Sequence, residues 1–319
     1  MPLLTSNYDP PYFFKQPHFS TIYSGTIRKV KGVYQKRERI NLPDGDFLNL
    51  DWSFSSRKAS KATVLLHGLE GNAQRSYMLG SAKILARSGH DVCAVNFRGC
   101  SGEPNLKYHS YHSGATKDLR SVLHHIVHTK EYNEIYLKGF SLGGNLLLKY
   151  LGEGNPVPQQ LKGAMAISVP CQLADSLTQL LSFKNILYAI RFKKNLLEKL
   201  RAKQKVFPDL ISNADIARVK TLKDFDDIYT SKAHGYADAM DYYAQCSSLQ
   251  FLASITVPTL IVNAQNDSFL GEACYPVEEA RRSKSVFLEI PEYGGHVGFY
   301  GPNGFTYTEQ RAVEFFAGL

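Results

Sequence analysis

The sequence lacks the features that would anchor the chain in a membrane or hold a small fold together. No stretch approaches the roughly 18 consecutive apolar residues that a membrane-spanning helix requires. No Lys or Arg precedes Lys15, so a secretory signal is not expected. The five cysteines are an odd number and no two lie closer than seven positions, which argues against a disulfide framework and a CxxC metal or redox motif. We therefore expect a cytoplasmic protein with reduced thiols and no metal or other cofactor.

The composition is that of an ordinary globular protein. Of the 319 residues, 44% are hydrophobic and 21% are charged, which lies outside the ranges typical of disordered chains. We find no internal repeat and no low-complexity linker. A chain of this length can bury about three quarters of its unfolded surface. One domain over residues 1–319 is therefore expected.

Acidic residues are too few to balance the basic ones, 29 against 37, which leaves a net charge of +8. Residues 184–205 alone contain eight basic residues and one acidic residue. Apolar residues recur there at helical spacing, such as Leu187 with Ile190 and Leu196 with Leu200. Such a tract can bind nucleic acid, lie on an anionic membrane surface, or face solvent while its apolar side packs on a core. We find no nucleic-acid-binding signature and keep the other two interpretations.

The chain is predicted to begin irregularly and then to form a hairpin. Residues 1–30 read as irregular because four prolines, at positions 2, 10, 11 and 17, interrupt any element. Two alternating runs, YQKRERINL and DFLNLDWSF, flank Pro43, Asp44 and Gly45, whose residue types favour a tight turn. Two antiparallel strands are expected there.

Beyond the hairpin, short apolar runs alternate with helical patterns. The runs that predict strands are residues 62–68, 91–99, 134–141, 161–170, 257–267 and 285–296. The segments with helical spacing are residues 77–88, residues 117–129, NLLLKYLGEG and TEQRAVEFFAGL. This alternation predicts an α/β fold with a mostly parallel sheet, helices on both faces and the antiparallel hairpin at one edge. Residues 171–250 interrupt the alternation and are predicted to form a helical cap.

A candidate nucleophile lies in GFSLGG (139–144), where a predicted strand meets a predicted helix. At such a sharp turn Ser141 would be held in strained backbone geometry, and the glycines two before and two after it would let the neighbouring elements approach. The first N–H groups of the helix would also point toward developing negative charge. The alternative is a glycine-rich turn with a capping serine. The strand–turn–helix context favours the nucleophile.

A nucleophilic serine needs a base, and the base needs an orienting carboxylate. Only two histidines follow Ser141: His234, inside the predicted cap, and His296, in the loop after the last predicted strand. We predict that His296 is the base. Asp267, which ends another predicted strand, is the favoured acid because chain order and position both fit. The competing acids are Asp175, Glu272 and Glu292.

The loop HGLEG (67–71) follows a predicted strand and matches an HGxxG oxyanion loop. Its Leu69 N–H and the Leu142 N–H, which follows the nucleophile, are the expected donor pair of an oxyanion hole. His67 is expected to be structural, because such a loop acts through its backbone. Cys100, within FRGCSGEPN, is interpreted as a small buried apolar residue rather than a nucleophile.

Together these motifs resemble the YheT-like α/β-hydrolases, a family that includes eukaryotic α/β-hydrolase-domain lipases and esterases. The segments that carry the resemblance are LPDGDFLNLDWS (42–53), HGLEG (67–71), FRGCSGEPN (97–105), YHSG (111–114), GFSLGGN (139–145), PTLIVNAQND (258–267) and GGHVGF (294–299). The resemblance implies an α/β-hydrolase fold with Ser141, Asp267 and His296 as the triad, and it adds no cofactor. It departs in the acid loop, NDSFLG, where a proline-bearing DDPF-type sequence is expected.

The sequence thus predicts a serine hydrolase, carboxylesterase- or lipase-like, that acts on carboxylic esters through an acyl-serine intermediate. Two alternatives stay open: acyl transfer to an alcohol by the same triad, and a non-catalytic protein that keeps the fold to bind a ligand. The expected partner is a small-molecule or lipid acyl ester.

Overall fold

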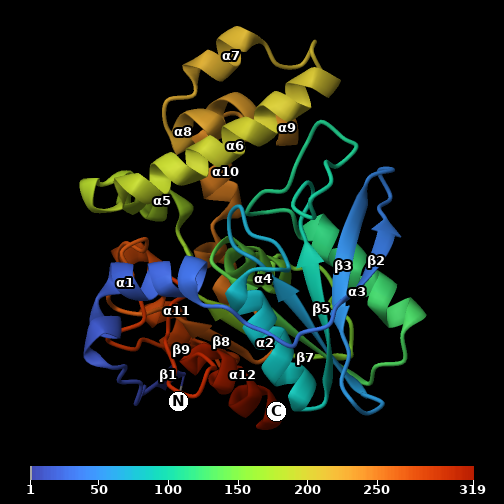
Figure 1. Ribbon diagram of the computed structural model, residues 1–319, viewed down its shortest axis with the longest axis vertical. Coiled ribbons are helices and arrows are strands. Elements are labelled where there is room, and N and C mark those ends of the chain that lie inside the picture. The colour runs from blue at the N-terminus through green and yellow to red at the C-terminus, as the bar shows by residue number, and fades with distance from the viewer. Residues whose placement is uncertain (1) are drawn as a thin grey trace.

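A single sheet organises the chain in the computed structural model, which describes residues 2–319 (Figure 1). Its strands are β1 (Leu3–Leu4), β2 (Lys36–Asn41), β3 (Phe47–Ser53), β4 (Lys61–Leu66), β5 (His90–Asn96), β6 (Glu134–Phe140), β7 (Leu161–Ile167), β8 (Thr259–Val262) and β9 (Val286–Glu289). They lie in the order β1-β9-β8-β7-β6-β4-β5-β3-β2. β2 pairs antiparallel with β3, and β3 with β5, while the other neighbours are parallel. The predicted α/β fold is confirmed.

The predicted hairpin forms the edge of the sheet. Lys36 on β2 faces Trp52 on β3, and the pairing continues to the turn. The turn closes because the Leu42 N–H donates to Asp46 O at 2.8 Å and the Gly45 N–H donates to Leu42 O at 2.9 Å. Gly45 has φ 79°, a left-handed conformation that glycine adopts without steric cost.

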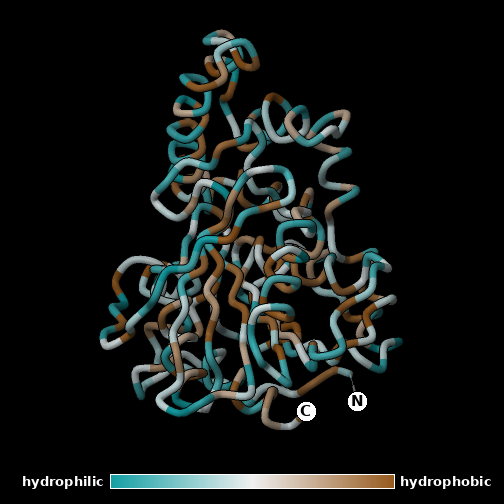
Figure 2. Tube along the Cα trace, turned by 90° about the vertical axis from the view of Figure 1, so that its right-hand side faces the viewer, coloured by the Kyte–Doolittle hydropathy of each residue, from teal (hydrophilic) through white to brown (hydrophobic). Residues whose placement is uncertain are grey.

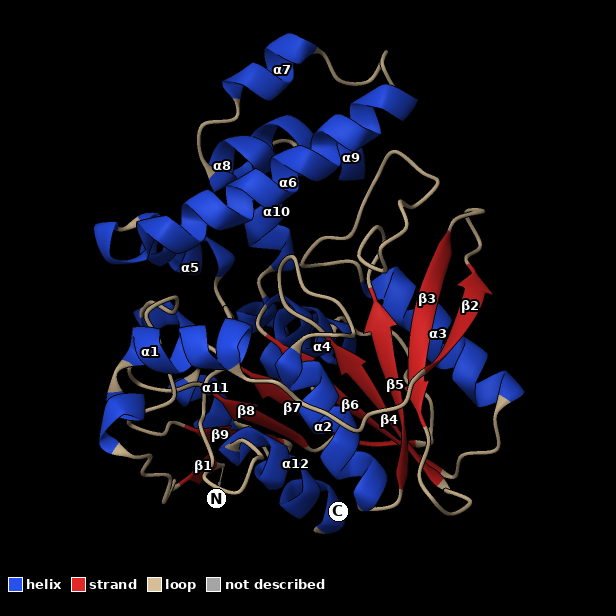
Figure 3. Ribbon diagram, in the orientation of Figure 1, coloured by secondary structure: helices blue, strands red, loops and turns tan. Residues whose placement is uncertain are grey.

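Helices cover both faces of the sheet (Figure 3). The helices outside the cap are α1 (Pro17–Ile22), α2 (Ser76–Arg87), α3 (Thr116–Thr129), α4 (Leu142–Gly152), α11 (Val277–Arg282) and α12 (Tyr307–Ala317). Side chains alternate along β4, so Val64 and Leu66 join the core under α3 and α4, while Leu65 joins the core under α2 and α12. Coverage on both faces explains why the strands read as unbroken apolar runs. Figure 2 shows these hydrophobic strands inside the lower body of the molecule.

The N-terminal segment is more regular than its prolines suggest. The prediction that residues 1–30 are irregular is wrong: they contain β1, η1 (Tyr12–Lys15), α1 and η2 (Tyr23–Ile27), and only Met1 lies outside the described residues. Pro17 is the first residue of α1, where a missing N–H costs nothing and the fixed φ suits a helix. The proline therefore starts this helix instead of breaking it.

The predicted insertion, residues 171–250, lies between β7 and β8 and is helical. Its elements are α5 (Leu173–Leu181), η3 (Phe183–Asn185), α6 (Ile186–Val206), α7 (Asn213–Arg218), α8 (Leu222–Phe225), η4 (Asp226–Thr230), α9 (Ser231–His234), α10 (Ala239–Cys246) and η5 (Ser248–Ser254). These helices stand above the carboxyl ends of the parallel strands (Figure 1). They bury an apolar cluster of their own, which includes Leu196, Leu200 and Phe225. No helix within residues 2–319 has the length and apolar character needed to cross a bilayer.

Candidate active site

Ser141 sits at a sharp turn between β6 and α4. Its backbone has φ 51° and ψ −120°, a strained conformation for a residue with a side chain. The flanking glycines are needed because a Cβ atom on Gly139 would lie 2.5 Å from Gly143 O, and one on Gly143 would lie 2.5 Å from His67 O. The spacing of GFSLGG is therefore required by the packing of β6, α4 and the loop after β4, and it holds the Ser141 hydroxyl above the sheet.

Three predicted side chains form one hydrogen-bonded chain. Nε2 of His296 lies 2.9 Å from Ser141 Oγ, and Nδ1 of His296 lies 2.9 Å from Asp267 Oδ2. The Asp267 carboxylate is fully buried and the His296 ring is 11% exposed. This order of atoms suits a triad, in which the carboxylate accepts from the Nδ1–H and Nε2 accepts from the serine hydroxyl.

The histidine is held by residues that the sequence analysis did not single out. The His296 N–H donates to Thr21 Oγ1 of α1 at 2.9 Å, across 275 residues of chain. The Phe269 ring stacks on the imidazole with 4.3 Å between centroids, and the Phe269 N–H donates to Asp267 Oδ1 at 2.9 Å. The Asn266 side chain accepts from the Gly295 N–H at 3.0 Å. Only the fold brings α1 and the acid loop to the histidine, so no local motif marks them.

The competing candidates lie elsewhere. Asp175, in the first turn of α5, accepts the Ala273 N–H at 2.9 Å. Glu272 and Glu292 are exposed. His234 ends α9 in the cap, where its ring packs 4.2 Å from that of His112. Among residues 2–319, Asp267 is the carboxylate that hydrogen-bonds to His296.

The loop HGLEG lies directly against the serine. A Cβ atom on Gly68 would be 3.2 Å from Ser141 Cβ. Neither the Leu69 N–H nor the Leu142 N–H has a hydrogen-bond acceptor in the described part of the chain. Leu142 opens α4, whose first N–H groups carry the positive end of the helix dipole. The two predicted donors are therefore available on either side of Ser141.

His67 has the structural position that we expected. Its Nδ1–H donates to Gly68 O at 2.8 Å, and its Nε2 accepts the Phe97 N–H at 3.2 Å. Burial of the ring, followed by the charges of nearby cations, lowers the pKa of His67 to about 3, even though the bond to Gly68 O acts the other way. The ring is therefore neutral at physiological pH and ties the HGLEG loop to the loop after β5.

An ion pair joins this loop to the cap. The Glu70 carboxylate, 4% exposed, accepts from Lys199 Nζ of α6 at 2.9 Å and from the Tyr111 hydroxyl at 2.7 Å. The same Tyr111 oxygen accepts the Glu70 N–H at 2.9 Å. Glu70 has φ 53°, so these bonds hold a strained residue next to Leu69. Lys199 belongs to the basic tract, and its partner could not be inferred because the two lie 129 residues apart.

The motif FRGCSGEPN follows β5 and borders the same site. The Arg98 guanidinium, 7% exposed, pairs with Asp44 and Asp46 of the hairpin turn and with Asp118 of α3, all within 3.0 Å. These ion pairs join the hairpin, the loop after β5 and α3. Burial raises the pKa of the Cys100 thiol to about 11, which agrees with the expectation that it is not a nucleophile.

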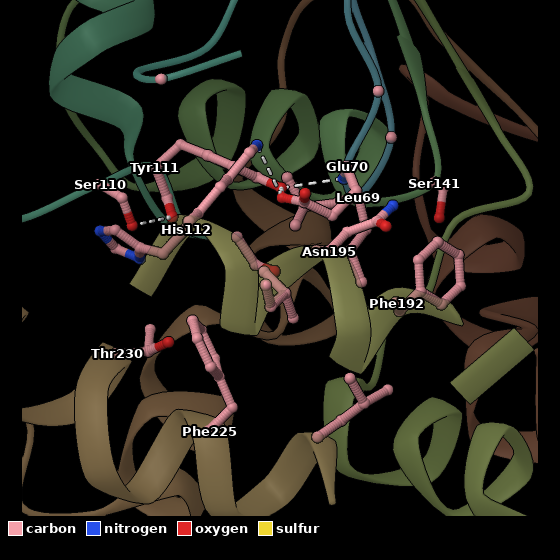
Figure 4. A pocket seen from close by; sticks show the side chains of 18 of the residues that line it. Leu69, Glu70, Ser110, Tyr111, His112, Ser141, Phe192, Asn195, Phe225 and Thr230 are labelled. Carbon is pink, nitrogen blue, oxygen red and sulfur yellow. Dashed lines mark hydrogen bonds and ion pairs between the residues drawn. The ribbon is translucent and has the colours of Figure 1, made fainter. Parts of the chain in front are cut away.

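A cavity of about 480 Å³ lies between the cap and the sheet, with Ser141 and His296 in its wall. Most of its other walls are apolar; residues that contribute to them are Leu173, Leu177, Leu180, Phe192, Leu196 and Tyr229. In Figure 4, Ser141 and Phe192 lie at one end, and Ser110, Tyr111 and His112 lie at the other. Among residues 2–319 no cluster of His, Cys, Asp and Glu side chains could hold a metal ion.

Known proteins share this architecture and sequence. Residues 62–301 match the family described as alpha/beta hydrolase fold. YheT of Escherichia coli, provisionally named an esterase, is 35% identical over 93% of this chain and 88% of its own length. Phospholipase ABHD3 of Mus musculus is 29% identical over 98% of this chain and 79% of its own. Monoacylglycerol lipase ABHD2 of Bos taurus is 27% identical over 98% and 80%.

Solved structures agree at the level of the fold. The esterase Pf2001 of Pyrococcus furiosus superimposes with a TM-score of 0.61 at 17% sequence identity, covering 91% of this chain and 95% of that one. At that identity the likeness concerns architecture alone. The family match and the identity to YheT together show that this chain belongs to the alpha/beta hydrolase fold family, among its YheT-like members.

Proposed function

We propose that the protein hydrolyses carboxylic esters through an acyl-serine intermediate on Ser141. The observation that carries this proposal is the hydrogen-bonded chain from Ser141 through His296 to Asp267 in the wall of an apolar cavity. A serine hydroxyl is a weak nucleophile until a base takes its proton, and an oriented imidazole 2.9 Å away is suited to do so.

The chemistry follows from this arrangement. Ser141 Oγ attacks the ester carbonyl while its proton passes to His296 Nε2, and Asp267 stabilises the resulting imidazolium. The oxyanion accepts from the Leu69 and Leu142 N–H groups. The imidazolium then gives its proton to the departing alcohol oxygen, which leaves the acyl group on Ser141. His296 next takes a proton from water, the hydroxyl attacks the acyl-serine, and the acid departs as Ser141 regains its proton.

The cavity favours an ester with a hydrocarbon acyl chain. Its lining is mostly apolar, so moving an alkyl chain from water into the cavity would be favourable by about 0.8 kcal/mol for each CH₂ group buried. The relatives named phospholipase and monoacylglycerol lipase act on acyl lipids by their names, which supports the same substrate class for this chain.

The proposal is tested with p-nitrophenyl esters of increasing acyl length. Ser141→Ala should lower kcat on every ester to near the background, since triad members act as a unit. Asp267→Asn should lower kcat by about 10⁴-fold, because the amide favours the wrong histidine tautomer. Asp175→Asn is the matched control and should retain wild-type turnover. If Ser141→Ala keeps its activity, or if Asp175→Asn is the severe variant, the assignment is wrong.

A further inference from the structure

The basic tract of α6 does not have the two faces that its sequence suggests. Leu196 and Leu200 are buried within the cap, whereas Leu187 is 78% exposed and Ile190 is 51% exposed. Lys199 turns toward Glu70, as described above. α6 therefore buries one apolar face in the cap and leaves Leu187 and Ile190, near its N-terminus, exposed.

Some basic residues of this tract make contacts and others are free. Lys203 donates to Asn105 Oδ1 at 2.6 Å, and Lys193 donates to Lys220 O at 2.7 Å. Lys184, Arg191 and Lys194 are exposed and take part in no ion pair within residues 2–319. Arg201 and Lys205, farther along α6, are exposed too and also take part in no ion pair within the described residues. Free positive charge thus extends along the helix, and near its N-terminus this charge lies beside the exposed Leu187 and Ile190.

A second apolar surface lies next to it. On η1 and α1, Tyr12 is 77% exposed, Phe13 70%, Phe19 42% and Ile22 45%. The Phe13 ring lies 5.9 Å from Tyr12 and 6.5 Å from Phe19, so these side chains form one cluster. Exposed aromatic and aliphatic side chains in one cluster commonly mark an interaction surface.

The two surfaces meet at an opening of the cavity. His18 Nδ1 of α1 lies 3.3 Å from the Tyr188 hydroxyl of α6, and their rings stack. Ile22 and Arg191 both line the cavity and are both exposed, so the cavity reaches the surface between them. Figure 1 shows α1 beneath the end of α6 that follows α5. The combined surface, here named the mouth face, consists of Tyr12, Phe13, Phe19, Ile22, Phe183, Leu187 and Ile190.

Basic residues predominate at the α6 side of the mouth face. Residues 183–194 contain four basic residues and no acidic one, whereas on the neighbouring η1 Lys15 pairs with the exposed Asp9 at 2.7 Å. Exposed apolar side chains beside the free cations Lys184, Arg191 and Lys194 complement a bilayer that carries anionic head groups. An acidic protein partner would satisfy the charge, but it would not use an opening that leads to Ser141.

We propose that the mouth face docks on the surface of an anionic lipid bilayer, so that an acyl ester passes from the bilayer into the cavity without crossing water. Phe183, Leu187 and the cluster around Phe13 would enter the interface, and Lys184, Arg191 and Lys194 would contact anionic head groups. The passage of an ester rests on the proposed function, whereas the docking itself does not.

The test is co-sedimentation of the Ser141→Ala protein with vesicles of phosphatidylcholine, with and without phosphatidylglycerol. Because this variant is used throughout, the result does not depend on whether the protein is an esterase. The expected result is binding to the anionic vesicles that weakens as salt rises, since head-group attraction is screened. Adding Phe183→Ser and Leu187→Ser should weaken binding about tenfold or more, because two large apolar side chains no longer enter the interface.

The matched control is the pair Leu106→Ser and Leu210→Ser, whose side chains are 61% and 57% exposed. Leu210 follows α6, whose 21 residues span about 30 Å, and Leu106 lies between Asn105 and Lys107, which both accept from Lys203 Nζ near the same end of the helix. These changes therefore lie far from the mouth face and should leave binding unchanged. Equal loss in both pairs, or equal binding to neutral and anionic vesicles, would overturn the proposal. So would a dimer in sedimentation velocity that Phe183→Ser with Leu187→Ser abolishes, since the mouth face would then contact a second copy.

Discussion

Replacing Lys199 by Met should lower turnover more than it weakens substrate binding. Lys199 lies on α6 and does not belong to the triad, but its ammonium is 2.9 Å from the buried Glu70 carboxylate. Glu70 directly follows Leu69, whose N–H is one of the two proposed oxyanion donors. Loss of the ammonium leaves a buried charge whose remaining partner is the Tyr111 hydroxyl. The carboxylate should then move toward water and displace the loop.

The magnitude follows from burial. Breaking a fully buried ion pair costs about 3–5 kcal/mol. Here the Glu70 side chain is 4% exposed but the Lys199 side chain is 40% exposed, so solvent screening reduces the cost to about 1–3 kcal/mol. Complete loss of one oxyanion donor lowers kcat by about 10²–10³. Since the loop is displaced rather than removed, we expect a decrease in kcat of about tenfold, with KM changed little.

The assay is steady-state hydrolysis of a short soluble ester by three variants. Lys199→Met alone should show the decrease in kcat. Glu70→Gln together with Lys199→Met should regain most of it, because a neutral amide can stay buried and still accept from Tyr111. Lys194→Met, an exposed position on the same helix, is the control and should match the wild type. Equal kcat in Lys199→Met and wild type, or no recovery in the double variant, would refute this role for the pair.

Two further predictions concern stability. Lys138 is fully buried, with Nζ donating to Thr308 O at 2.9 Å and Ser81 Oγ at 3.0 Å, and burial lowers its pKa from 10.5 to about 7. Between pH 7 and pH 10.5 the unfolded chain therefore holds a proton on Lys138 that the folded chain has lost. In that range this lysine makes the free energy of unfolding rise by about 1.4 kcal/mol per pH unit, and this contribution is lost as the pH falls toward 7. Urea unfolding should show that the free energy of unfolding of the wild type, relative to that of Lys138→Met, increases by about 3 kcal/mol from about pH 7.5 to about pH 9.5. A difference that stays constant with pH would contradict this prediction. Gly143→Ala should destabilise the protein by about 3 kcal/mol or more, because the new Cβ atom would lie 2.5 Å from His67 O. Gly25→Ala is the control and should change stability little, because nothing lies within 4 Å of its Cβ position. Equal melting temperatures for the two variants would contradict the packing argument.

Much of the sheet and the predicted triad follow from local patterns. Runs rich in Val and Leu mark the parallel strands because both faces of the sheet are covered. Ser141 directly follows β6, and Asp267 and His296 lie in the loops after β8 and β9, where chain order narrows the choice. The structure then brings them within hydrogen-bonding distance.

Long-range contacts and competing surfaces set the limit of sequence reasoning. The Thr21 bond to His296 spans 275 residues, and no periodicity encodes it. Pro17 reads as a breaker until its place in the first turn of α1 is known. The spacing within residues 184–205 correctly predicts a helix. Different side chains of α6 pack against the other cap helices, contact the HGLEG loop or face solvent. The amphipathic pattern alone does not tell which side chains contact the cap helices, the HGLEG loop or solvent.

The central claim is that Ser141 is an activated nucleophile, and covalent labelling tests it most directly. A fluorophosphonate reacts with an activated serine when the hydroxyl oxygen bonds to phosphorus and fluoride leaves. After treatment of the folded protein, peptide mass spectrometry should find one adduct on Ser141, absent from Ser141→Ala and formed far more slowly in Asp267→Asn. An unlabelled Ser141, or an adduct on another residue that persists in Ser141→Ala, would contradict the account.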